Sequence, residues 1–71
     1  MTKFAEYEVM RLMSDLPEHG LKAGAIGTVL IVHGGPIPAY EVEFCGSTGE
    51  TLALLTLTEE VLEAQAQHQR T

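Results

Sequence analysis

The chain has 71 residues with ten acidic and four basic side chains, so its formal net charge at pH 7 is −6. We expect a chain of this length to form one domain, residues 1–71, whose core is marginal without a crosslink or a partner. The single cysteine excludes a disulfide framework, and the acidic balance argues against nucleic acid and anionic membranes as partners. No segment resembles a secretory signal or a membrane span, and we expect a cytoplasmic protein.

The first strand is expected over residues 7–13, with Val9 in the core together with Leu12 or Met13. Its apolar residues alternate imperfectly, and several of them also favour helix, so a short helix is the alternative interpretation. The strand is preferred because a proline and a glycine interrupt the chain directly afterwards, and these predict a loop over residues 14–20.

The strand prediction is strongest for residues 25–33, where β-branched side chains dominate. Both alternating sets of side chains are apolar, which is typical of a strand at the centre of a sheet. Gly27 within it indicates a bend, a bulge or a close backbone approach. Residues 34–38, Gly-Gly-Pro-Ile-Pro, predict a loop. No helix N-terminus follows its glycines to complete an anion site, so a simple connection is preferred.

Residues 39–45 alternate strictly between core-facing and polar positions. The predicted core face carries Tyr40, Val42 and Phe44. A hairpin turn over residues 46–49 leads into a returning strand over residues 50–57. A C-terminal helix with a polar, Gln-rich tail is predicted over residues 58–70, with Thr58 as its N-cap.

The returning strand is apolar on both faces. Whichever register the hairpin takes, one leucine set shares a face with Glu41 and Glu43, so we expect that face to be covered by the C-terminal segment or by another subunit. The candidate oligomer interface is Leu52, Leu54, Leu55, Leu57, Val61 and Leu62.

The candidate ligand-facing residues are His33, Glu41, Glu43 and Cys45. Glu41 and Glu43 lie two residues apart on one strand face, about 7 Å from each other, a spacing that also suits an acid and base pair. His33 can approach Cys45 across neighbouring strands, but a nucleophile also needs a group that orients its base, and none is evident. A solvated or interfacial strand face is the commoner interpretation of such residues.

Metal ligation is not expected. The soft or borderline ligands are His19, His33, Cys45 and His68, which are widely spaced and form no close pair. We therefore expect no metal, no cofactor and no enzymatic activity.

The run at residues 15–29, Asp-Leu-Pro-Glu-His-Gly-Leu-Lys-Ala-Gly-Ala-Ile-Gly-Thr-Val, together with residues 39–44, Gly49 and residues 52–57, resembles a small bacterial family of domains of unknown function, number 4926. The resemblance covers nearly the whole chain. That family is similar to SH3-like small barrels, so the resemblance implies a mainly β fold, a five-stranded SH3-like barrel with a short C-terminal helix. It implies no activity, and Ala25 departs from the acidic residue that such barrels often carry.

Three hypotheses for function follow. The first is a non-enzymatic interaction module that forms a homo-oligomer through an apolar strand face. The second is an accessory or regulatory subunit of a larger enzyme or toxin-type system, with a protein partner still to be identified. The third is a small-ligand-binding or catalytic barrel that uses His33, Glu43 and Cys45.

Overall fold

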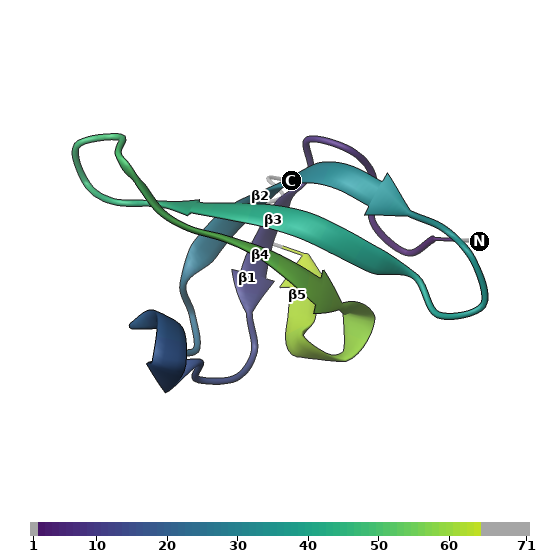
Figure 1. Cartoon of the computed structure of the whole chain (residues 1–71), viewed down its shortest axis with the longest axis horizontal. Coiled ribbons are helices and arrows are strands. Elements are labelled where there is room, and N and C mark those ends of the chain that lie inside the picture. Colours follow the sequence, from purple (N-terminus) through teal and green to yellow (C-terminus); the bar gives the residue numbers. More distant parts are fainter. Residues whose placement is uncertain (1, 65–71) are drawn as a thin grey trace, which may run out of the picture.

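The fold is one antiparallel sheet in a computed structural model that describes residues 2–64 (Figure 1). Its strands are β1 (Val9–Leu12), β2 (Ile26–His33), β3 (Ala39–Cys45), β4 (Thr51–Thr58) and β5 (Leu62–Ala64). They lie in the order β4-β3-β2-β1-β5, so β2 is central, as its two apolar faces predicted. The chain is therefore mainly β. The first four predicted strands are confirmed to within two residues at each end, which excludes the short helix for the first of them.

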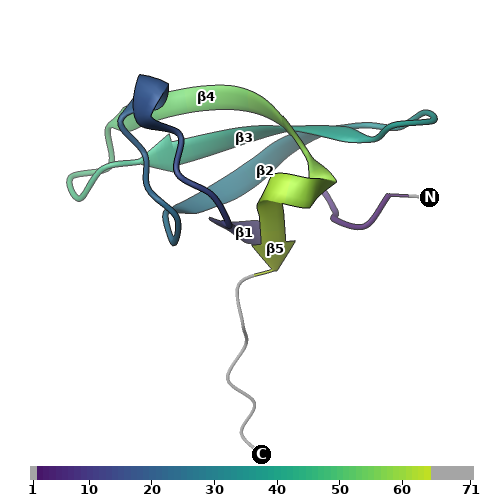
Figure 2. The same cartoon turned by 90° about the horizontal axis from the view of Figure 1, so that it is seen from below.

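The sheet is strongly bent but not closed. Figure 2 shows β1 and β5 lying across one side of the layer that β2, β3 and β4 form. A bulge at Leu30 interrupts the pairing of β2 with β3 and adds to the curvature. Within residues 2–64, β4 pairs only with β3, and the three residues of β5 pair only with β1. The predicted SH3-like barrel is therefore not confirmed.

The predicted C-terminal helix is wrong where the structure describes the chain. Glu59–Val61 makes a single 3-10 turn, and Thr58 before it makes no side-chain cap. The backbone at Leu62 is extended, with φ −122° and ψ 146°, and Leu62 lies opposite Leu12 in the sheet. Burial of Leu62 in the core, with ladder hydrogen bonds to β1, outweighs the weak helix preference of this segment. Residues 65–70 of that prediction lie outside the described residues.

The core lies on the concave side of the sheet. Tyr40, Val42 and Phe44 are fully buried, as predicted for alternate residues of β3. In β1 the prediction for Val9 is wrong, because Val9 is exposed and Met10 is buried in its place. Met10 lies opposite a glycine of β2, and the missing side chain leaves room for a long, flexible methionine on the core face.

Tyr40 fastens the N-terminal segment to the sheet. Its hydroxyl donates to Oε2 of Glu59 at 2.6 Å and accepts from the backbone N–H groups of Lys3 at 3.0 Å and Phe4 at 3.3 Å. The Phe4 and Tyr40 rings meet edge to face, with centroids 5.3 Å apart. The buried hydroxyl therefore both donates and accepts hydrogen bonds, as a buried polar group requires. The pKa of Tyr40 is raised, first by burial and then by its hydrogen bond to Glu59.

Candidate functional site

The candidate polar residues lie on the side of the sheet opposite the core, which we call the outer face. On this face Glu43 lies between Leu54 of β4 and Thr28 of β2. Glu41 lies one row further along, between Thr56 and Ile31. The two glutamates therefore share a face, as predicted, and each has a threonine on one neighbouring strand and an apolar side chain on the other.

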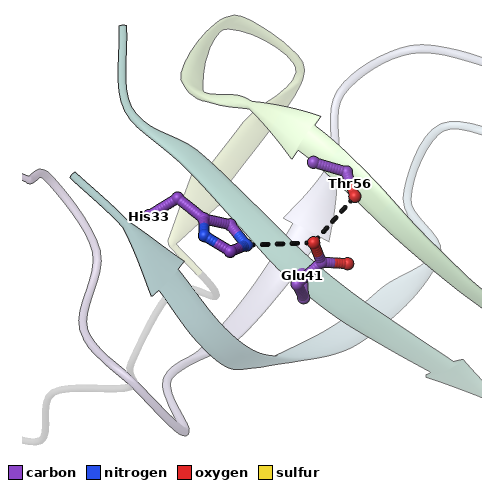
Figure 3. Close-up of polar contacts among 3 residues, drawn as sticks. All are labelled: His33, Glu41 and Thr56. Carbon is purple, nitrogen blue, oxygen red and sulfur yellow. Dashed lines mark hydrogen bonds and ion pairs between the residues drawn. The ribbon is translucent and has the colours of Figure 1, made fainter. Parts of the chain in front are cut away.

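Three of the outer-face side chains form a hydrogen-bonded cluster (Figure 3). Oε2 of Glu41 lies 3.0 Å from Nε2 of His33 and accepts from Oγ1 of Thr56 at 2.8 Å. The hydrogen bond from Thr56, and then that from His33, hold the pKa of the Glu41 carboxyl below its usual value. A carboxylate stabilised in this way is a weaker base, so the cluster is better suited to fixing side chains than to taking up a proton.

Cys45 lies at the far end of β3 from this cluster. His33 pairs with Ala39, which is six residues from Cys45 along the strand, or roughly 20 Å at the usual rise per residue. The structure therefore does not bring His33 and Cys45 together, contrary to the nucleophile hypothesis. Partial desolvation, and then the neighbouring carboxylate of Glu43, raise the pKa of the Cys45 thiol. The reactive thiolate is accordingly disfavoured.

Glu43 is occupied by a neighbour on β4. Its Oε2 accepts a hydrogen bond from Oγ1 of Thr51. Within residues 2–64, no three His, Cys, Asp or Glu side chains come together as a metal site would require, and those residues enclose no pocket. No helix in this part of the chain is long and apolar enough to cross a bilayer. His68, one of the four candidate metal ligands considered from the sequence, lies outside the described residues.

The predicted interface residues do not share one face. Leu52 and Leu54 are on the outer face, with 55% and 56% of their surface exposed. Leu55 and Leu57 face the core side and are half-buried. Val61 is half-buried in the 3-10 turn, and Leu62 is fully buried in the core. Four of the six residues lie on the same strand, β4.

β4 is an edge strand of unusual composition. It has eight residues, Thr-Leu-Ala-Leu-Leu-Thr-Leu-Thr, with no charged side chain and no proline. Proteins commonly protect such an edge with lysine, proline or an inward-pointing charge, because its unpaired backbone groups can template another strand. The sequence contains a signal for this edge, because the second strand of the hairpin has no charged residue. Sorting the leucines by face of the sheet does not reveal the edge, because side chains of both faces lie along it.

The pairing of Tyr40 with Glu59 was also missed from the sequence. A tyrosine on a core face needs a partner for its hydroxyl, and that requirement was the available signal. The partner was not identifiable because Glu59 was assigned to a helix N-terminus.

The chain matches a known protein family. The family is described as Domain of unknown function (DUF4926), and the match spans residues 6–64. No curated protein and no solved structure gives a significant match.

Proposed function

The chain belongs to the DUF4926 family of domains of unknown function, and from that premise we propose that it is a non-enzymatic interaction module that self-associates through β4. One observation carries this proposal. Leu52 and Leu54 are more than half exposed on a strand that has a neighbour on only one side within the described residues. Exposed apolar groups on such an edge are typical of an interaction surface.

The free energy gained by burying the exposed leucines limits how tightly two chains can associate through this surface. Burying a whole leucine side chain is worth about 1.5–3 kcal/mol, so the exposed half of each leucine offers roughly 1 kcal/mol. Two copies contribute four such side chains, or about 4 kcal/mol, which is near the lower end of what association costs in lost freedom. Side-chain burial alone therefore gives weak association, and backbone hydrogen bonds at the edge are needed to strengthen it.

Features of the outer face support a non-enzymatic role. His33 is engaged with Glu41, and the raised pKa of Cys45 keeps its thiol protonated at neutral pH. Glu43 is likewise engaged with Thr51. His33, Glu41 and Glu43 thus each have a local hydrogen-bond partner that explains their position.

The test is the mass of the full chain by light scattering across micromolar to millimolar concentrations. We expect the average mass to rise with concentration toward twice that of one chain. Leu54→Lys is expected to abolish the rise, because it places a positive charge in an apolar contact and would leave that charge buried without a partner. Ile31→Lys is the matched control, since Ile31 is similarly exposed on the same face but lies on the central strand. A mass of one chain at millimolar concentration would refute self-association.

A second candidate function is that of an accessory or regulatory subunit of a larger enzyme or toxin-type system. Ile26 and Ile31 favour it, because both are exposed on β2 and self-association through β4 leaves them uncovered. Purification of the tagged chain from its native cells is the test. A stoichiometric protein partner that is lost with Ile31→Lys and kept with Leu54→Lys would support this role, and recovery of the chain alone would count against it.

A further inference from the structure

We propose that two copies of this chain join by antiparallel pairing of their β4 strands, around a two-fold axis at Leu54, so that two five-stranded sheets become one continuous sheet. This inference rests on the proposed self-association and specifies its geometry. It also names the partner, which is the same strand of a second copy.

The backbone of β4 supplies the first argument. In an antiparallel ladder, alternate residues direct their N–H and C=O groups away from the paired neighbour. Within residues 2–64, β4 has β3 as its only neighbour, and no backbone hydrogen bond reaches its other edge. The strand has eight residues without a proline, so each of them keeps a backbone N–H group to donate. Added-strand pairing of this kind draws its affinity from main-chain hydrogen bonds, which is the contribution that leucine burial alone lacks.

The other edge of the sheet is poorly suited to pairing. β5 has only three residues. Its central residue, Glu63, forms an ion pair with Arg11 of β1, with 2.8 Å between Oε2 and Nε. A short strand that carries a charge is a common way to prevent edge pairing. Of the two described edges, β4 is therefore the one that can accept a copy.

Self-pairing at Leu54 suits the side chains on both faces. Residues directly opposite each other share a face, so Leu54 meets Leu54 of the second copy on the outer face. On the core side, Ala53 lies opposite Leu55 of the other copy, and the half-buried Leu55 becomes covered there. One edge thus covers an exposed leucine, Leu54, and a half-buried leucine, Leu55.

Charge favours edge pairing over stacking of the outer faces when two copies meet. The chain has a net charge of −6, and stacking two outer faces would press Glu41 and Glu43 toward their counterparts. Edge pairing instead separates the two β3 strands by three strand spacings, or roughly 14 Å. That separation exceeds the screening length of about 8 Å at physiological salt. No charged residue of β4 faces its counterpart, because the strand carries none. A basic partner, by contrast, would be drawn to the glutamates and not to this strand.

Disulfide trapping in the full chain tests the geometry. With Cys45→Ser as the background, Leu54→Cys is compared with Ile31→Cys after mild oxidation. Opposed Cα atoms in an antiparallel pair lie about 4.5–5.5 Å apart, which is within the range that a disulfide can bridge. We expect a several-fold higher crosslinked fraction for Leu54→Cys than for Ile31→Cys, although both positions are similarly exposed.

Light scattering on the unmodified chain separates the two proposals. If the chain self-associates and Leu54→Cys does not crosslink above the Ile31→Cys level, the β4 geometry is overturned while self-association stands. If the unmodified chain stays a single chain, both fail. Amide hydrogen exchange of the unmodified chain provides a readout independent of the variants. The amides of β4 are expected to exchange several-fold more slowly at high than at low concentration, and equal exchange would overturn the pairing.

Discussion

At the scale of single residues, Gly27 of β2 allows close packing against β3. A Cβ at this position would lie 2.7 Å from Cγ1 of Val42 and 2.9 Å from Cε1 of Phe44. Both neighbours are fully buried on β3, so neither can swing into solvent to make room. The glycine that the sequence marked as a bend, a bulge or a close approach is the last of these, and the bulge lies instead at Leu30.

Gly27→Ala is therefore expected to destabilise the fold by about 1–3 kcal/mol, the usual cost of overpacking a core. Urea denaturation would show a lower midpoint with an unchanged slope. Gly34→Ala is the matched control, because a Cβ there meets nothing within 4 Å, and its effect should stay within about 0.5 kcal/mol. Equal stabilities for the two variants would contradict the close packing at Gly27.

At the scale of elements, one side chain holds three segments together. Tyr40 of β3 joins the N-terminal segment, through the N–H groups of Lys3 and Phe4, to the 3-10 turn that carries Glu59. The hydrogen bond from Tyr40, and then that from the Lys3 backbone, lower the pKa of the Glu59 carboxyl. A carboxyl with a lowered pKa in the folded state stabilises the fold above its unfolded pKa. That contribution is lost as the pH falls through the folded value.

Tyr40→Phe keeps the buried ring and removes only the hydroxyl, so we expect a loss of about 1–2 kcal/mol from the orphaned partners. The free energy of unfolding of both proteins, Tyr40→Phe and the unmodified chain, should be measured from neutral to acidic pH. The difference between them is expected to become smaller in acid, once Glu59 is protonated. If the difference in stability stays constant down to pH values below the pKa of Glu59 in the folded state, the hydrogen bond to Glu59 does not account for the effect of Tyr40→Phe.

The elements also show which features could be predicted from sequence. Strict alternation at residues 39–45 fixed both the strand and its core face, because a period of two admits only two assignments. The segment after Thr58 was misassigned because capping and charge describe only a local preference. Leu62 is positioned by its pairing with Leu12 of β1, about fifty residues earlier in the chain. A pattern of neighbouring residues cannot predict such a distant contact. The separation of His33 from Cys45 likewise depends on the register between strands.

Leu62→Ala tests the strand assignment. A residue fully buried in the core is expected to lose about 2–4 kcal/mol of stability on truncation, whereas a residue on a fraying helix would lose little. Thermal or urea unfolding at low micromolar concentration, where chains are apart, gives the comparison. Leu52→Ala serves as the exposed control, with an expected change of less than about 0.5 kcal/mol. A small effect at Leu62 would place it outside the core.

At the scale of the whole molecule, charge and association oppose each other. Each chain carries a net charge of −6, so two copies repel at long range, whereas in the proposed dimer the uncharged β4 would provide the contact. Added salt screens the repulsion and leaves apolar and backbone contacts intact. The dissociation constant of the dimer is therefore expected to fall as sodium chloride is raised from low to moderate concentration, as measured by analytical ultracentrifugation. A dissociation constant that rises with salt would indicate that ion pairs hold the copies together.

The unequal edges of the sheet have one more consequence, which concerns where assembly stops. An uncharged strand without proline is the kind of segment that stacks into open-ended fibrils when both of its sides are available. Here β3 occupies one side of β4, so a second copy uses the only side that remains. Among the described residues, the outermost strands of the joined sheet would then be the two short β5 strands, each carrying a charge. In the proposed arrangement growth would therefore stop at two chains, because the edge that allows association is used up once two copies have joined.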